Sequence, residues 1–208
     1  MKKKIKEIMK KIKFKLILKV IKNYLKTNML EIVFLITCLL NGILLRYLTV
    51  KNYFNIKPVL GDLVVLLVII IFGYLVNPKH RFKYYLIWSI VLSILCFINC
   101  VYYNNYISFI SLSLIKTSSE LKGYTGAVTN LLEIKDFVFL IPLALFMFIH
   151  KKFFKDKYYN NVIKEEKNIT RMIVSGILCL LVGMIFMSKL TATDMSRLNK
   201  QWDRRYTV

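Results

Sequence analysis

The stretch from Met29 to Leu48 reads MLEIVFLITCLLNGILLRYL, and it decides the fold class. As an α-helix rising 1.5 Å per residue, a run of this length crosses the roughly 30 Å of hydrocarbon in a bilayer. A membrane-spanning β-strand would be shorter and would alternate between apolar and polar residues, which this stretch does not do. The stretch therefore predicts a transmembrane helix.

Four further apolar runs follow it along the chain. The five predicted transmembrane helices cover residues 29–48, 59–76, 84–103, 134–150 and 172–188. Hydrophobic residues make up 57% of the 208 residues, and only 7 Gly and 3 Pro leave little room for long loops. A formal net charge of +21 together with this hydrophobicity argues against a soluble nucleic-acid-binding domain and against a disordered basic tail. We predict an all-α membrane protein with five transmembrane helices, and one transmembrane domain over residues 29–188.

The lysines and arginines predict the orientation of these helices, because short positively charged loops stay in the cytoplasm. Eleven lysines precede the first helix, and the loops at 77–83 and 151–171 are also basic, whereas the loops at 49–58 and 104–133 are poorer in positive charge for their length. This alternation predicts a multi-pass protein of the cell membrane. Its N-terminus is expected in the cytoplasm and its tail, residues 189–208, outside.

Two segments outside the apolar runs have the pattern of helices lying at the membrane surface. Residues 1–28 place Ile5, Ile8 and Ile12 at helical spacing among lysines, which predicts a basic amphipathic cytoplasmic helix bound to anionic membrane lipids. The segment lacks the regular aromatic and glycine residues that would support base stacking, so we expect no nucleic-acid partner. Residues 104–135 mix apolar and hydroxyl side chains, which predicts interfacial helices between the third and fourth transmembrane helices.

Polar residues at the outer ends of the helices form the candidate site. Arg46 lies near the outer end of the first helix and Asp62 in the first turn of the second, and the short connection is expected to bring the two together. Asn99, Tyr103 and Asp136 are expected at the same level. Two interpretations remain open: an ion pair and aromatic belt that help to assemble the bundle, or a polar mouth that holds an anionic lipid head group.

Catalytic and metal-binding motifs are absent from the sequence. It contains no Gly-rich phosphate loop, no HExxH and no GxSxG, so no catalytic residue is assigned. Cys96 and Cys100 share a helix face, but with Ser89 and Ser93 they form a small-residue stripe, which favours close helix packing over a metal site.

Several pieces of the chain, taken in order, resemble the membrane-embedded N-terminal part of the lipoteichoic acid synthase family, which are sulfatase-related phosphoglycerol transferases. The resembling pieces are residues 41–49, 57–62, 77–81, 102–113, 127–132, 136–137 and 194–206. The resemblance implies five transmembrane helices, a cytoplasmic N-terminus and an extracellular catalytic domain after the tail. That domain would carry a nucleophilic Thr and Mn²⁺ and transfer glycerol phosphate from phosphatidylglycerol to a polymer of the cell envelope.

None of the family's catalytic or metal-binding positions falls within these 208 residues. We therefore expect the chain by itself to be non-catalytic and to hold no cofactor, with Mn²⁺ expected only in the missing catalytic domain. The resemblance suggests phosphatidylglycerol and a separate sulfatase-like catalytic domain as partners. The alternative interpretation is a non-enzymatic membrane scaffold or a small transporter.

Overall fold

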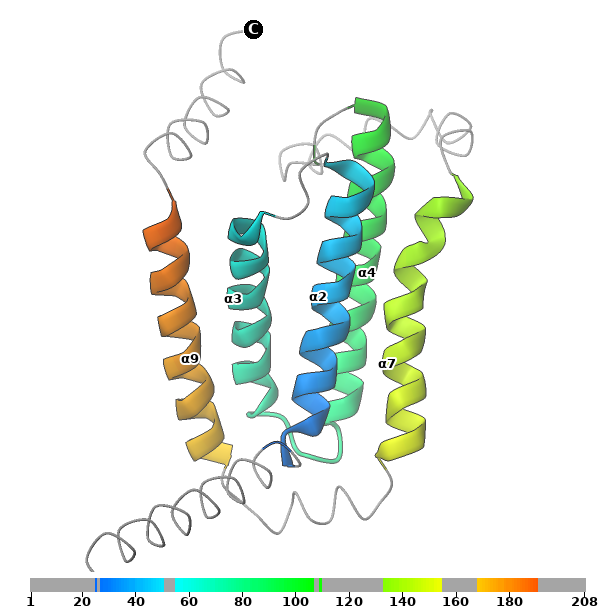
Figure 1. Ribbon diagram of the computed structural model, residues 1–208. Coiled ribbons are helices and arrows are strands. Elements are labelled where there is room, and N and C mark those ends of the chain that lie inside the picture. The colour runs from blue at the N-terminus through cyan, green and yellow to red at the C-terminus, as the bar shows by residue number, and fades with distance from the viewer. Residues whose placement is uncertain are drawn as a thin grey trace, which may run out of the picture.

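The computed structural model describes residues 25, 27–50, 55–106, 109, 133–154 and 168–190. All regular structure within these residues is helical, which confirms the predicted all-helical class for this part of the chain. The elements are α2 (Met29–Thr49), α3 (Ile56–Gly73), α4 (Arg81–Tyr106), the 3₁₀ helix η2 (Ile134–Phe139), α7 (Leu140–Phe153) and α9 (Asn168–Lys189). The α-helices stand side by side, with α9 and α7 at opposite edges and α2 near the middle (Figure 1).

Four of the described helices are long and apolar enough to cross a membrane: α2, α3, α4 and α9. The fourth predicted run, residues 134–150, is divided instead into six residues of 3₁₀ helix and the 14-residue α7. Pro142 accounts for the division, because it has no N–H to bond the carbonyl of residue 138 and is best tolerated in the first turn of an α-helix. η2 and α7 together still line the edge of the bundle beside α2 and α4 (Figure 1).

The second helix begins and ends earlier than predicted. Residues 59–76 were the expectation, whereas α3 starts at Ile56, because the Asn55 side chain accepts a hydrogen bond from the N–H of Lys57 at 3.0 Å and caps the helix. Asp62 consequently lies in the second turn of α3 rather than in the first. This shift places the carboxylate deeper in the bundle than the sequence suggested.

Three predicted segments lie largely or wholly outside the described residues. They are the amphipathic helix in residues 1–28, the interfacial helices within residues 104–135, and the tail at residues 189–208.

Aromatic rings form the centre of the packing between three helices. Phe34 of α2 stacks on Tyr85 of α4 with the ring centroids 4.7 Å apart, and it meets Phe146 of α7 edge-on at 6.2 Å. All three side chains are fully buried. Because lipid tails are as apolar as these rings, the gain comes from shape-matched contact between helices rather than from exclusion of water.

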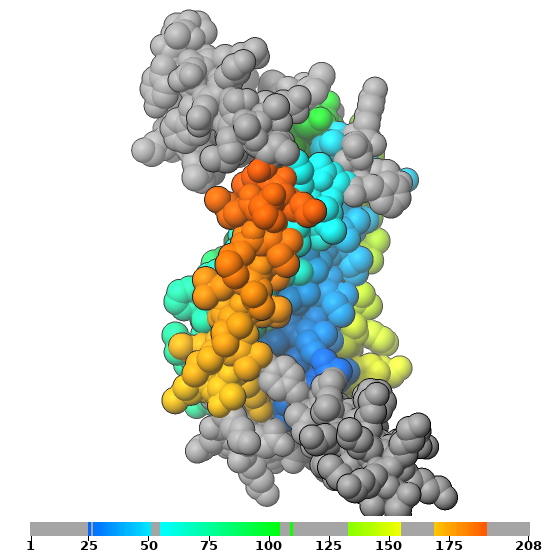
Figure 2. Space-filling view, turned by 60° about the vertical axis from the view of Figure 1, so that its left-hand side comes forward, coloured from blue at the N-terminus to red at the C-terminus, as the bar shows by residue number. Residues whose placement is uncertain are grey.

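Two residues of the predicted small-residue stripe on α4, Ser89 and Ser93, pack against α2. Asn41 Nδ2 donates a 2.8 Å hydrogen bond to Ser93 Oγ, and Cys38 Sγ lies 3.7 Å from Ser89 Oγ. Small side chains at these positions let the two backbones approach closely. On the other side of the bundle α9 covers α3, as Figure 2 shows, where Cys179 Sγ donates to the carbonyl of Val64 at 3.8 Å.

Candidate functional site

Arg46 and Asp62 form an ion pair between α2 and α3. Arg46 Nη1 donates to Asp62 Oδ2 at 2.6 Å. The side chain of Arg46 is 10% exposed, whereas that of Asp62 is 39% exposed. The expected juxtaposition of these two residues is therefore present, and the pair is open on the side of Asp62.

The pair lies deeper than the predicted polar mouth. A Cβ built on Gly42 would lie 2.5 Å from Asp62 Oδ2 and 3.4 Å from Arg46 Nη2. The Arg46 side chain therefore folds back along α2 toward the preceding turn, in the direction in which helical side chains tilt. Along the helix axis, Gly42 lies about 10 Å before Thr49, the last residue of α2. The charges consequently lie within the bundle, and a Cβ at position 42 would require the Asp62 carboxylate to shift.

Two of the three guanidinium nitrogens of Arg46 make no hydrogen bond to the described part of the chain. Nε and Nη2 of Arg46 are buried and have no hydrogen-bond partner among the described residues. A guanidinium carries five N–H donors, and an arginine between membrane-spanning helices normally directs them at carboxylates or carbonyls. The ion pair with Asp62 therefore satisfies Arg46 only in part.

The other three predicted site residues have separate contacts. Asp136 is 1% exposed, caps η2 by accepting from the N–H of Glu133 at 3.0 Å, and accepts a weak bond from Cys100 Sγ at 3.6 Å. Asn99 donates to the carbonyl of residue 95 on its own helix at 2.8 Å, and the Tyr103 ring lies 4.9 Å from that of residue 109. The structure thus assigns Asp136 a capping role, and these contacts do not gather the three residues around Arg46.

A second buried ion pair at the opposite end of the bundle was missed by the sequence analysis. Arg81 Nη1 lies 3.3 Å from Glu31 Oε1, and the two side chains are 2% and 4% exposed. Arg81 also donates from Nε to the carbonyl of Gly73 at 3.1 Å and from Nη2 to the carbonyl of Val76 at 3.4 Å. All three guanidinium nitrogens of Arg81 therefore have acceptors, in contrast to those of Arg46.

Neighbouring side chains extend this second pair into a network, called here the basal cluster: Asn28, Glu31, Tyr74, Arg81 and Arg171. The guanidinium of Arg81 lies over the Tyr74 ring at 5.3 Å, and Tyr74 donates to Asn28 Oδ1 at 3.2 Å. Arg171 of α9 is 4% exposed and acts electrostatically on Glu31. The basal cluster thereby joins α2, α4 and α9 to the turn that follows α3. The sequence signal for this cluster is Glu31, a carboxylate within the apolar run 29–48, because a charged group there requires a partner.

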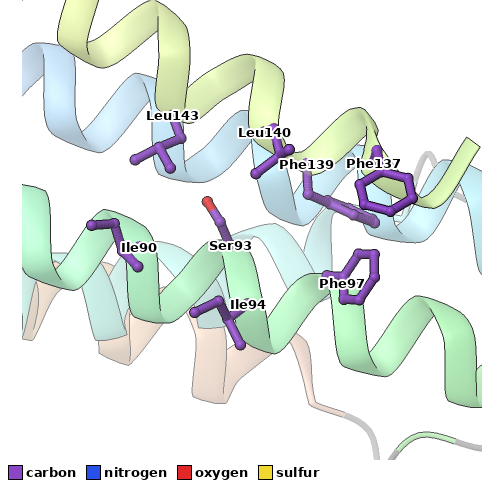
Figure 3. A pocket seen from close by; sticks show the side chains of 8 residues that line it. All are labelled: Ile90, Ser93, Ile94, Phe97, Phe137, Phe139, Leu140 and Leu143. Atoms are coloured by element: carbon purple, nitrogen blue, oxygen red, sulfur yellow. The ribbon is translucent and has the colours of Figure 1, made fainter. Parts of the chain in front are cut away.

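An apolar groove of about 280 Å³ lies between α4 and the η2–α7 segment. Phe97 of α4 faces Phe137 and Phe139 of η2 at one end, and Ser93 lies along the wall (Figure 3). The Ser93 hydroxyl already accepts the hydrogen bond from Asn41. The groove therefore has the chemistry to receive an apolar chain and not a polar substrate.

Metal binding finds no support in the described part of the chain. No group of three His, Cys, Asp or Glu side chains among these residues is arranged to hold a metal ion. Mn²⁺, which the resemblance implies for the family, does not fit the described residues.

Comparison with known proteins agrees with the resemblance found in the sequence. The family described as the lipoteichoic acid synthase N-terminal domain matches residues 1–208. Lipoteichoic acid synthase of Staphylococcus saprophyticus subsp. saprophyticus is 23% identical, over 77% of this chain and 26% of that protein. The chain thus spans about a quarter of the length of this relative, and no solved structure matches it. The chain belongs to the lipoteichoic acid synthase N-terminal domain family.

Proposed function

We propose that this chain is the membrane module of a phosphoglycerol transferase that builds a polymer of the cell envelope. In this proposal a sulfatase-like catalytic domain outside the cell, on the same polypeptide or on a partner, transfers glycerol phosphate from phosphatidylglycerol. The module holds that domain at the membrane surface where its lipid substrate lies. The observation that carries the proposal is the family match over the whole of residues 1–208.

The proposal includes a fifth crossing of the membrane by η2 and α7. Six residues of 3₁₀ helix and 14 residues of α-helix reach together about 33 Å, which is enough to cross the hydrocarbon. The described helices alternate in direction, so the start of α4 and the end of α7 lie at the same end of the bundle (Figure 1). By sequence, Lys79 and Lys83 lie at the start of α4 and Lys151 at the end of α7. By the positive-inside rule that end is cytoplasmic, and the segment after α9 is then outside.

Reconstitution in vesicles that contain phosphatidylglycerol and Mn²⁺ tests the proposal. The chain alone should release no diacylglycerol, because the sequence contains no catalytic motif and the described residues form no metal-ligand set. Release should begin when the catalytic domain of a family member is added, and it should be faster in vesicles with the chain than without it. Equal rates with and without the chain, or sustained release by the chain alone, would contradict the proposal.

A further inference from the structure

Arg46 carries two buried N–H-bearing atoms for which the described chain offers no acceptor. The residue is 8% exposed, its Nη1 is engaged by Asp62 at 2.6 Å, and its Nε and Nη2 have no hydrogen-bond partner among the described residues. Leaving a charged donor buried without an acceptor costs more than a typical hydrogen bond contributes. Such an arrangement indicates an acceptor supplied from outside the described chain.

The Arg81–Glu31 pair is the comparison within the same structure, because it contains an arginine whose hydrogen bonds are all made to the chain. All three nitrogens of Arg81 donate within the chain, and both side chains are almost completely buried. The Arg46–Asp62 pair differs in both respects, since Asp62 is 39% exposed and Arg46 is engaged through one nitrogen. The Arg46–Asp62 pair is therefore both incomplete and accessible.

Gly42 leaves space beside the two charges. A Cβ at this position would overlap Asp62 Oδ2 in its present place. Because glycine has no Cβ, the Asp62 carboxylate and the Arg46 guanidinium can both lie against this face of α2. A ligand that approaches past Asp62 meets the planar guanidinium, which matches the oxygen atoms of a phosphate group. The neighbouring carboxylate disfavours a multiply charged anion and accepts hydrogen bonds from hydroxyl groups.

We infer that Arg46, with Asp62, binds the phosphodiester of a lipid head group that carries hydroxyl groups. A lipid is the favoured source, because Arg46 lies in the last turn of α2, a helix long and apolar enough to cross a membrane, and lipid head groups lie at the ends of such helices. The inference rests on the proposed function only in that the chain lies in a membrane. Its test measures lipid binding and not glycerol phosphate transfer, so failure of the lipid-binding inference would not imply failure of the proposed function, nor the reverse.

The test compares the same substitution at the two arginines. Purified, delipidated chain is titrated in native mass spectrometry with phosphatidylglycerol, with diacylglycerol of identical acyl chains, and with glycerol 3-phosphate. Arg46→Lys keeps the charge for Asp62 but removes the two unused donors, whereas Arg81→Lys makes the same change where every nitrogen is already engaged. Thermal unfolding of each variant reports whether the bundle is intact.

We expect the wild type to retain phosphatidylglycerol over diacylglycerol, and Arg46→Lys to weaken that retention by about ten-fold or more, since bonds to charged groups are lost. Arg81→Lys should lower thermal stability while leaving the retention of phosphatidylglycerol unchanged. Equal retention by wild type and Arg46→Lys, or equal retention of phosphatidylglycerol and diacylglycerol, would overturn the inference. Displacement of the lipid by equimolar glycerol 3-phosphate would overturn the assignment to a lipid.

Discussion

Replacing Gly42 by alanine tests whether the Arg46–Asp62 pair holds α2 against α3. A methyl group at position 42 would lie 2.5 Å from Asp62 Oδ2, which is closer than real Cβ contacts allow. The carboxylate must then move away, and its 2.6 Å contact with Arg46 Nη1 is lost or lengthened. The substitution thus acts on the ion pair without removing either charge.

The expected magnitude follows from two opposing contributions. Loss of a hydrogen bond between charged groups costs about 1.5 to 3 kcal/mol, while alanine in place of glycine inside a helix gains about 1 kcal/mol. Gly42→Ala should therefore lower the free energy of unfolding by about 0.5 to 2 kcal/mol. Gly176→Ala on α9 is the matched control, because a Cβ there has no neighbour within 4 Å and only the helix gain remains.

Both variants are compared with the wild type by reversible unfolding in mixed detergent micelles, followed by circular dichroism. We expect Gly42→Ala to unfold more readily than the wild type and Gly176→Ala to be equal to it or more stable. If the two alanine variants are equally stable, the Arg46–Asp62 contact does not hold the helices together and the argument from Gly42 is wrong.

Four further substitutions probe the two ion pairs and the aromatic core. Arg46→Ala and Asp62→Ala should each lower the free energy of unfolding by about 1 to 3 kcal/mol, while the double variant should lose much less than the sum of the two. If the two losses simply add, the two side chains do not stabilise each other. Arg81→Ala should be more damaging, by about 3 to 5 kcal/mol, because it leaves Glu31 buried without its partner, and a loss under 1 kcal/mol would contradict the role of the basal cluster. Tyr85→Phe should be neutral or stabilising in the same assay, because the hydroxyl is buried with no partner among the described residues, and a loss above about 1 kcal/mol would reveal an acceptor.

The predictable part of this fold is the part governed by length and hydrophobicity. Apolar runs located all the described α-helices, and the short connection between the first two correctly indicated that Arg46 meets Asp62. Helix ends were less predictable, since the Asn55 cap starts α3 at Ile56, three residues before the expected start. Because of the earlier start of α3 and the backward tilt of the Arg46 side chain, the Arg46–Asp62 pair lies deeper between the helices than the polar site that the sequence predicted at their outer ends.

The basal cluster could not be read from charge alone. Arg81 was counted with its lysine neighbours as a loop charge that sets orientation, yet it is 2% exposed and faces Glu31. Local sequence does not say which of several neighbouring cations turns inward, because the choice depends on carbonyls freed at the end of α3. Asp136 was correctly singled out as a polar residue at a helix start, but its contacts make it a cap.

The position of the segment that follows α9 is the most direct test of the proposed membrane module. Alkaline phosphatase fused after Val208 reports this position, because it is active only outside the cytoplasm, and a fusion after Lys152 provides the internal comparison. Five crossings predict an active fusion after Val208 and an inactive one after Lys152. Four crossings, with α7 lying outside the membrane, would place both ends of the chain in the cytoplasm. An inactive fusion after Val208, shown to be produced in full, would contradict the module proposed here.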